Sequence, residues 1–178
     1  MIPEGYEIRE LTADDAPALA AAYRRNREHL ARRDPRRDED FYTDDGQAAA
    51  VAGQLASMES GLSAAWLMVY DGQVVGRVNL NNIVMSVFRS ASIGYWVDVD
   101  HLRRGLARGS VEFACAQAQG RGLHRVEAGT MVDNEASQRV LEACGFELFG
   151  LAPRYLFIDG AWQDHKLYQR ILHDNPPA

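Results

Sequence analysis

One stretch of the chain, residues 93–107, has the residue types and spacing of a phosphate-binding loop. The apolar run Ile93–Val97 predicts a buried strand, a polar turn and a basic loop around Gly105 follow it, and a helical pattern extends from Leu106 to about Ala118. The first N–H groups of a helix have no partner within the helix and lie at the positive end of its dipole. Glycine allows the backbone to approach a bulky anion closely. These features predict a diphosphate held by main-chain amides.

Two other phosphate-binding motifs do not fit this loop. A nucleotide P-loop requires G-x-x-x-x-G-K-[ST], but the sixth residue counted from Gly105 is Ser110, and no lysine follows it. A dinucleotide fingerprint requires G-x-G-x-x-G, a spacing that the loop lacks. Arg103, Arg104 and Arg108 add positive charge at the same point. Taken alone, R-R-G-L-A also fits an ordinary surface turn before a helix.

A second helix start with polar residues follows the next predicted strand. Asn134-Glu135-Ala136-Ser137 opens this helix, and Gly145-Phe146 follows it. Asn134 is either a helix cap or a ligand-binding amide, and Ser137 is either a surface hydroxyl or a reactive one. Since open α/β sheets bind ligands at the carboxyl ends of their strands, we expect both helix starts to flank one site.

The hydrophobic pattern predicts the elements that must position these residues. Strands are expected at Tyr6–Leu11, Ala64–Tyr70, Val74–Val84, Ser90–Val97, Arg125–Val132, Glu147–Ile158 and Ala161–Leu172. Helices are expected from a Thr12 cap through Leu30, from an Asp44 or Asp45 cap over about Gly46–Ser60, from Leu106 and over Glu135–Cys144. Asp71-Gly72 and Asp159-Gly160 are two-residue hairpin signals. The order predicts a mixed α/β sheet with helices on both faces, in a single domain over residues 1–178 with a frayed tail, His173–Ala178.

The composition limits the classes of function. The chain has 178 residues, of which 47% are hydrophobic and 25% charged, with a net charge of −6. This charge disfavours nucleic-acid binding and favours a cationic substrate. Cys115 and Cys144 are expected to be buried, reduced thiols, and the five histidines have no metal-binding spacing. No signal-peptide pattern and no apolar run of about 18 residues is present, so we expect a soluble, cytoplasmic protein without a membrane partner.

The two helix starts together resemble a known family. R-R-G-L-A is similar to the coenzyme A pyrophosphate loop of the GNAT acyltransferase superfamily, [QR]-x-x-G-x-[GA], with Gly105 and Ala107 in place and Leu102 as a departure. The pattern N-x-x-S followed by V-L-E-x-x-G-F resembles the Rim-type branch, which acetylates protein N-termini, notably those of ribosomal proteins. The closing D-G-x-W-x-D-x-x-L-Y from Asp159 also resembles that branch, so the likeness spans nearly the whole chain.

The resemblance implies the GNAT fold, a mostly antiparallel seven-stranded sheet that splays between its fourth and fifth strands. It implies acetyl-CoA as cosubstrate, with the pantetheine arm in the splay, and no metal. The coenzyme-binding residues that it implies are Tyr95, Trp96, Val97, Arg103, Arg104, Gly105, Leu106, Ala107, Arg108, Asn134 and Ser137.

The implied reaction is direct attack of an amine on the thioester, with the backbone amide near Val97 stabilising the oxyanion. Many family members carry a tyrosine acid four residues before the helix-ending glycine, but Leu141 stands there, which leaves Ser137 as its replacement. Some Rim-type members carry a glutamate base where Leu156 stands here. The base candidates that remain are His29, Asp98 or a chain of waters. Tyr155 is a candidate for orienting the acceptor or for binding the water that carries the proton away.

The acceptor is the least constrained part of the site. Phe41 and Tyr42 are candidates for a lid over the acceptor, and Asn79 and Asn81 for a polar lining. The leading hypothesis is an acetyl-CoA-dependent N-acetyltransferase that modifies a protein N-terminus, as a monomer or homodimer. The alternatives are an acetyltransferase for a small amine, a coenzyme A sensor without catalysis, and a ribosome-associated binding module.

Overall fold

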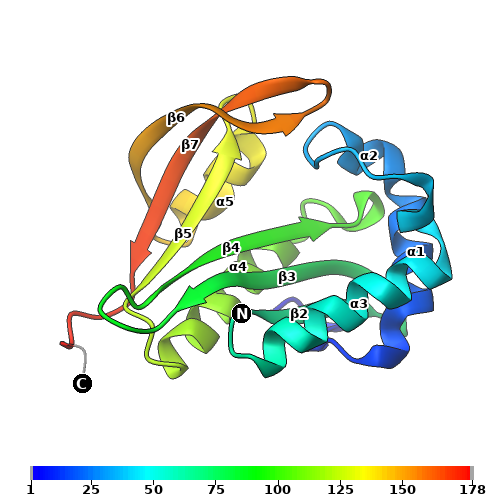
Figure 1. Ribbon diagram of the computed structural model, residues 1–178, viewed down its shortest axis with the longest axis horizontal. Helices are drawn as coiled ribbons and strands as arrows, with labels where there is room; N and C mark the ends of the chain where they lie inside the picture. The colour runs from blue at the N-terminus through cyan, green and yellow to red at the C-terminus, as the bar shows by residue number, and fades with distance from the viewer. Residues whose placement is uncertain (1, 177–178) are drawn as a thin grey trace.

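The computed structural model describes residues 2–176, and within them seven strands form one sheet in the order β1-β2-β3-β4-β5-β7-β6 (Figure 1). The strands are β1 (Tyr6–Glu10), β2 (Ala64–Tyr70), β3 (Gln73–Val84), β4 (Ser90–Val97), β5 (Arg125–Met131), β6 (Glu147–Ile158) and β7 (Ala161–Ile171). Neighbouring strands are antiparallel except for β4 and β5, which are parallel. The predicted mixed, mostly antiparallel sheet is confirmed.

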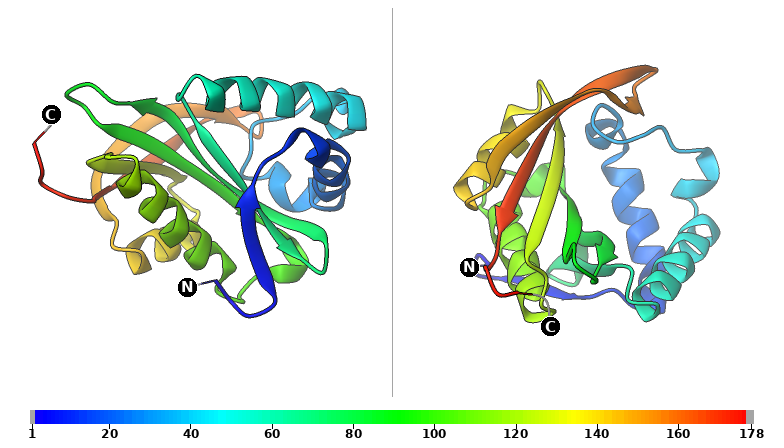
Figure 2. Two further views of the ribbon diagram at one scale, coloured as in Figure 1. Left: turned by 90° about the horizontal axis from the view of Figure 1, so that it is seen from below. Right: turned by 60° about the vertical axis from the view of Figure 1, so that its left-hand side comes forward.

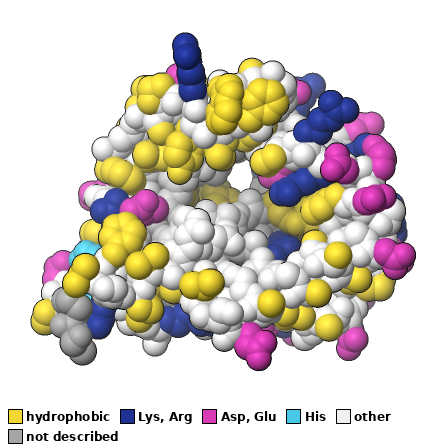
Figure 3. All heavy atoms as spheres, viewed as in Figure 1, with side chains coloured by type: hydrophobic (Ala, Val, Ile, Leu, Met, Phe, Trp, Pro, Cys, Tyr) yellow, Lys and Arg dark blue, Asp and Glu magenta, His cyan; other side chains and the backbone are white. Residues whose placement is uncertain are grey.

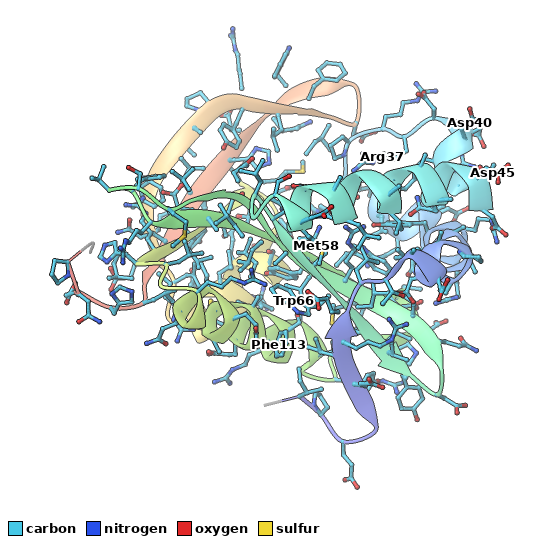
Figure 4. All side chains as sticks on the ribbon, turned by 60° about the horizontal axis from the view of Figure 1, so that its bottom comes forward. Arg37, Asp40, Asp45, Met58, Trp66 and Phe113 are labelled. Atoms are coloured by element: carbon cyan, nitrogen blue, oxygen red, sulfur yellow. The ribbon has the colours of Figure 1, made fainter. Side chains whose placement is uncertain are left out.

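Helices cover both faces of the sheet (Figure 2). The α-helices are α1 (Ala16–Arg25), α2 (Arg27–Ala31), α3 (Asp44–Glu59), α4 (Leu106–Gly120) and α5 (Glu135–Ala143), and short 3-10 turns are η1 (Ala13–Asp15), η2 (Glu39–Tyr42) and η3 (Val99–His101). One core lies between α4, α5 and the sheet, and another between α1, α3 and the opposite face. In the first core, Trp66 of β2 meets Phe113 of α4 edge to face, with ring centroids 5.5 Å apart (Figure 4).

The two Asp-Gly turns have the backbone that their sequence predicts. Asp71 and Gly72 have φ values of 48° and 73°, and Asp159 and Gly160 have values of 52° and 76°. Positive φ at both central residues gives the turn the twist of the flanking strands. The β2–β3 and β6–β7 hairpins are therefore confirmed.

The predicted helix from Thr12 through Leu30 is wrong as one element, because it breaks at Asn26. The Asn26 side chain is buried, its amide nitrogen donates to Ala22 O and to the Asp98 carboxylate, and its oxygen accepts from Val99 N–H at 2.8 Å. These bonds attach the helix end to the end of β4. The chain therefore does not continue as one helix past Asn26, whose side chain bonds to Asp98 and Val99 instead.

The predicted cap of the second helix is also corrected. Thr43, rather than Asp44 or Asp45, is the N-cap of α3, and its hydroxyl accepts from Gly46 N–H at 3.0 Å. Both aspartates lie in the first turn, where their charge favours the positive end of the helix.

The tail after β7 has no helix or strand up to residue 176, and residues 177–178 lie outside the described part of the chain. None of the helices within residues 2–176 is long and apolar enough to cross a membrane.

The splay between β4 and β5 is the feature that positions the site. The two strands pair only over Ser90–Ser92 and Arg125–Glu127. Beyond these residues, β4 remains paired with β3 up to Val97, and β5 remains paired with β7 up to Met131. The sheet therefore opens into a V, which is visible between the β3–β4 and β5–β7 sides of Figure 1.

Candidate functional site

A cleft of about 300 Å³ occupies the splay, and the surface is hollowed along this side of the molecule (Figure 3). Its walls come from both diverging strands, from the start of α5 and from the segment after α2. The lining residues are Ile93–Trp96 of β4, Ala128–Met131 of β5, the α5 cap Asn134, Ser137 and Leu141 of α5, Leu30 of α2 with Arg33, Asp34 and Pro35 after it, Leu156 and Ile158 of β6, and His165 of β7.

The free edge of β4 carries unpaired backbone groups that face the cleft. Asp98 N–H donates to Val75 O at 2.9 Å, so Val97 and Gly76 form a non-hydrogen-bonded pair of the antiparallel ladder. The N–H and C=O of Val97, and by alternation those of Tyr95, consequently point away from β3 and toward β5. An extended ligand in the cleft can pair with this edge as a strand does.

A second set of free amides lies at the N-terminus of α4. Gly105 is its N-cap with φ of 81°, in the left-handed region, and its carbonyl accepts from Gly109 N–H at 2.9 Å. The N–H groups of Leu106, Ala107 and Arg108 precede this first intrahelical bond, so they have no partner within the helix. This arrangement suits a diphosphate.

The arginines of this loop differ in their contacts. The Arg104 guanidinium donates to the Tyr6 hydroxyl at 3.2 Å and to Asp100 O at 3.1 Å, so it braces the loop against β1. Arg103 has a positive φ of 59°, and both it and Arg108 are exposed to solvent. Arg103 and Arg108 are thus the arginines free to reach a bound phosphate.

Two hydroxyl groups meet inside the cleft. The Tyr95 hydroxyl lies 2.8 Å from Ser137 Oγ, and Asn134 Oδ1 accepts from Ser137 N–H at 3.3 Å as the cap of α5. Burial raises the pKa of Tyr95 to about 12, against a smaller lowering by the bond to Ser137. Tyr95 therefore stays protonated at neutral pH and can act as the donor to Ser137. Leu141, at the position of the family tyrosine, is fully buried.

Trp96 lines the cleft only in part. Its indole lies on the other face of the sheet, in the core with α1, where its N–H donates to the Tyr23 hydroxyl at 3.2 Å. A side-chain contact of Trp96 with a coenzyme in the cleft is therefore not supported, although its backbone belongs to the β4 edge.

Asp98 does not have the geometry of a general base. Its carboxylate is 1% exposed and accepts from Arg25, Asn26 and Asp100 N–H at 2.7–3.0 Å. Burial acts to raise the pKa of Asp98, but these donors together lower it below its usual range. It does not line the cleft, so its role is to join α1, β4 and η3.

Of the other two predicted catalytic residues, His29 lies away from the cleft and Tyr155 lies beside one of its lining residues. His29 is exposed on α2 and lines neither the cleft nor the hollow beside it, which does not support a role as base. Tyr155 of β6 is 49% exposed, and its ring lies 5.3 Å from that of His165, which lines the cleft. Tyr155 is thus close enough to remain a candidate for orienting the acceptor.

A larger hollow of about 600 Å³ adjoins the cleft, between the α2–η2 segment and the β6–β7 turn. It shares Leu30, Asp34 and Pro35 with the cleft lining. Phe41 and Tyr42, the predicted lid residues, line this hollow. The guanidinium carbon of Arg37 lies 4.8 Å from the ring centre of Phe41, and that of Arg27 lies 4.4 Å from the ring centre of Tyr42.

Asn79 and Asn81, the residues predicted to line an acceptor pocket, line neither this hollow nor the cleft. Asn79 Oδ1 accepts from Arg77 Nε at 2.8 Å, and Asn81 lines a separate shallow groove beside α3. Conversely, Asp34 was missed by the sequence interpretation. It lies within an arginine-rich run that is typical of a solvated surface, and no local pattern predicts its place at the junction of the two cavities.

Over residues 6–147, the chain matches the family model described as the acetyltransferase (GNAT) domain, as the splayed sheet and the Gly105 loop indicate. The chain belongs to the GNAT acetyltransferase family. Among residues 2–176, no group of His, Cys, Asp or Glu side chains is arranged to hold a metal ion.

Individual GNAT acetyltransferases resemble the chain over nearly its full length. It is 32% identical to the ribosomal protein uS5 alanine N-acetyltransferase of Escherichia coli over 96% of this chain and 90% of the relative, and 30% identical to the probable N-acetyltransferase YjcK of Bacillus subtilis over 94% of each. The structure of the ribosomal-protein-S5-alanine acetyltransferase of Vibrio fischeri superposes with a TM-score of 0.92, at 32% identity over 96% of this chain and 95% of that one. The structure of Mycobacterium smegmatis RimJ in complex with a CoA-disulfide superposes with a TM-score of 0.90, at 29% identity over 96% of this chain and 84% of that one.

As a GNAT acetyltransferase, the protein is an acetyl-CoA-dependent N-acetyltransferase. Its donor groups fit that cosubstrate, because the α4 amides suit a diphosphate and the free β4 edge suits the amide-bearing arm. The bound thioester supplies an activated acetyl group. The protein's task is to hold it beside the acceptor amine and to move two protons.

Proposed function

We propose that this N-acetyltransferase acetylates the α-amine of a protein N-terminus, with ribosomal proteins as the acceptor class. The observation that carries the proposal is the 600 Å³ hollow joined to the cleft by Leu30, Asp34 and Pro35. A volume in the range of sites for drug-sized ligands gives more room than a single small amine requires. The relatives that act on ribosomal protein uS5 and S5 support this acceptor class.

Charged groups on the hollow's lining also favour a peptide end. Asp34, Asp38, Glu39 and Asp159 lie on it beside Arg27, Arg36 and Arg37. Arg27 pairs with Glu39, which leaves Asp34, Asp38 and Asp159 without an ion pair in the described part of the chain. Free carboxylates favour an ammonium group, and a mixed lining with the Phe41 and Tyr42 rings suits a chain of varied side chains.

In this proposal each group of the cleft has a separate task. The amides of Leu106, Ala107 and Arg108 bind the pyrophosphate, and the β4 edge pairs with the pantetheine arm. Val97 N–H stabilises the oxyanion as the amine attacks. The Ser137 hydroxyl, with Tyr95 as its donor, assists departure of the thiolate.

Thiol release from acetyl-CoA tests the acceptor class. We expect release with peptides that carry the first residues of ribosomal proteins, and none when the same peptides are already acetylated at the N-terminus. Release only with small amines would assign a small-molecule acetyltransferase instead, and coenzyme binding without release from any acceptor would favour a sensor. Acceptors of this class imply a cytoplasmic protein, and light scattering decides between a monomer and a homodimer.

A further inference from the structure

Asp34 occupies the junction between the cleft and the hollow, and its backbone is held there. The N–H groups of Arg33 and Asp34 both donate to Leu30 O at 2.9 Å, which ends α2, and Pro35 follows. Arg33 also pairs with Asp133 at 2.5 Å, on the opposite side of the cleft where β5 meets α5. The segment that carries Asp34 is therefore held by bonds to α2 on one side of the cleft and by the ion pair with Asp133 on the other.

Within residues 2–176 the carboxylates of Asp34, Asp38 and Asp159 on the lining of the hollow are all unpaired, and of the three only Asp34 also lines the cleft. Asp34 is half-buried, and no hydrogen bond or ion pair engages its carboxylate within residues 2–176, whereas Asp98, Asp133 and Glu39 are all paired. Among the described residues that line the cleft, Asp34 is the sole carboxylate. Asp34 thus places a free carboxylate where the hollow proposed for the acceptor meets the cleft proposed for the coenzyme.

We propose that Asp34 is the general base of the reaction, binding the acceptor's ammonium group and accepting a proton from it. This rests on the proposed function for the location of the acceptor, although it holds for any amine that enters through the hollow. It fills the role for which neither Asp98 nor His29 has the required position.

The proton and bond changes balance with Asp34 in this role. One N–H proton of the acceptor ammonium passes to the Asp34 carboxylate, which leaves a neutral amine. The amine nitrogen forms a bond to the acetyl carbon, and the carbon–sulfur bond breaks. The excess proton on the new amide nitrogen passes through the Ser137 hydroxyl to the departing thiolate, and Asp34 returns its own proton to solvent.

The electrostatic surroundings of Asp34 suit a base. Burial raises its pKa, against an opposing effect of Arg37, so its proton affinity moves toward the working pH. The charged and titratable groups that line the same cavities are Arg33 at the end of α2, Arg36, Arg37, Asp38 and Glu39 in the following segment, Arg27 and Tyr42 beside it, Tyr23 of α1, Asp159 of the β6–β7 turn, Tyr95 of β4 and His165 of β7.

The test compares Asp34→Asn with Asp40→Asn, which removes the same charge from an exposed residue outside both linings (Figure 4). At pH 7 we expect Asp34→Asn to lower kcat/KM about 100-fold. The deficit shrinks toward pH 9, because an α-amine with a pKa near 8 then loses its proton unaided. Asp40→Asn keeps the wild-type profile, and calorimetry gives all variants the same affinity for acetyl-CoA.

A kcat/KM of Asp34→Asn within threefold of wild type at pH 7 would overturn the proposal, as would a deficit of the same size at every pH. Retained acetyl-CoA affinity shows that the variant is folded. If Asp34→Asn loses acetyl-CoA affinity, Asp34→Glu takes its place in the test. Because this variant keeps a carboxylate, its kcat/KM must fall at acid pH as that of the wild type does. The assay uses whichever amine the wild type accepts. If every ribosomal peptide is rejected, the proposed acceptor class is wrong, but the proposed role of Asp34 is still tested with another amine.

Discussion

The hydroxyls of Tyr95 and Ser137 are in contact inside a cleft that lacks the family tyrosine. The family tyrosine position holds Leu141, which is packed in the core below the cleft. In the proposed mechanism the hydroxyl that assists the thiolate is Ser137 of α5, and the hydroxyl of Tyr95 contacts it from β4, across the splay. Under that proposal, two residues from different elements take the role of one tyrosine.

Removal of the Ser137 hydroxyl should separate turnover from binding. We expect Ser137→Ala to lower kcat at least about tenfold, the effect of one lost hydrogen bond to a developing charge, with acetyl-CoA affinity changed by less than about threefold. Steady-state kinetics and calorimetry measure the two quantities. Tyr95→Phe, which keeps the ring, should produce a smaller loss of the same kind. Unchanged turnover in Ser137→Ala would leave Ser137 as a surface residue of α5.

Other single residues explain why the sequence predicted only part of the site. The Gly105 loop and the Asn134–Ser137 start are local patterns, so their positions were predictable. Asp98 follows a strand as a site residue often does, but its partners Arg25 and Asn26 are more than 70 residues away. Asp34 resembles a solvated residue in sequence because its cavity is formed by elements remote from it.

At the scale of elements, the N-terminus of α4 should determine coenzyme affinity. We expect Gly105→Glu to abolish acetyl-CoA binding, because it places a carboxylate at the amides that receive the diphosphate. Gly105→Ala is the matched control. It adds only the strain of a side chain at a φ of 81°, roughly 1–2 kcal/mol, and should retain measurable affinity. Calorimetry compares the two, and normal binding by Gly105→Glu would exclude this loop as the diphosphate site.

The break between α1 and α2 should make stability depend on acid pH. The native pKa of Asp98 is lowered, so its contribution to the free energy of unfolding is full above the unfolded pKa of about 3.9 and is lost as pH falls through the lower native value. We expect Asp98→Asn to cost about 3 kcal/mol at pH 7 and to flatten this part of the profile. Urea unfolding between pH 2 and pH 7 measures both. A parallel shift at every pH would contradict the role of its charge.

The boundaries of helices and strands were predicted correctly where they depend on neighbouring residues in the sequence. Alternating strands and Asp-Gly turns depend on neighbouring residues, and both hairpins formed as predicted. The Asn26 break depends on β4, and the Thr43 cap depends on a hydroxyl that lies before the acidic pair. A local sequence pattern cannot predict the break at Asn26, because its cause lies in a distant strand. The cap of α3 could not be assigned because Thr43, Asp44 and Asp45 are adjacent and all three are good capping residues.

At the scale of the whole molecule, the sheet is two halves that share three pairs of residues between β4 and β5. A ligand that spans the splay therefore joins them. We expect acetyl-CoA at 100 times its Kd to raise the free energy of unfolding by about 2.7 kcal/mol. Hydrogen exchange should slow in β4 beyond Ser92 and in β5 beyond Glu127, with smaller changes in β1 and β2. Slowing confined to α4 would mean that the ligand does not enter the splay.

The lining of the hollow has a consequence for protein engineering. It comes from two contiguous pieces of chain, residues 23–42 and 157–160, whereas the diphosphate loop and the β4 edge lie between them in sequence. In the proposed function, the residues that select the acceptor and those that bind the coenzyme therefore lie in separate segments of the chain. Replacing residues 23–42 and 157–160 with those of a relative, while Asp34 is kept, should then transfer the relative's acceptor selectivity without changing coenzyme binding.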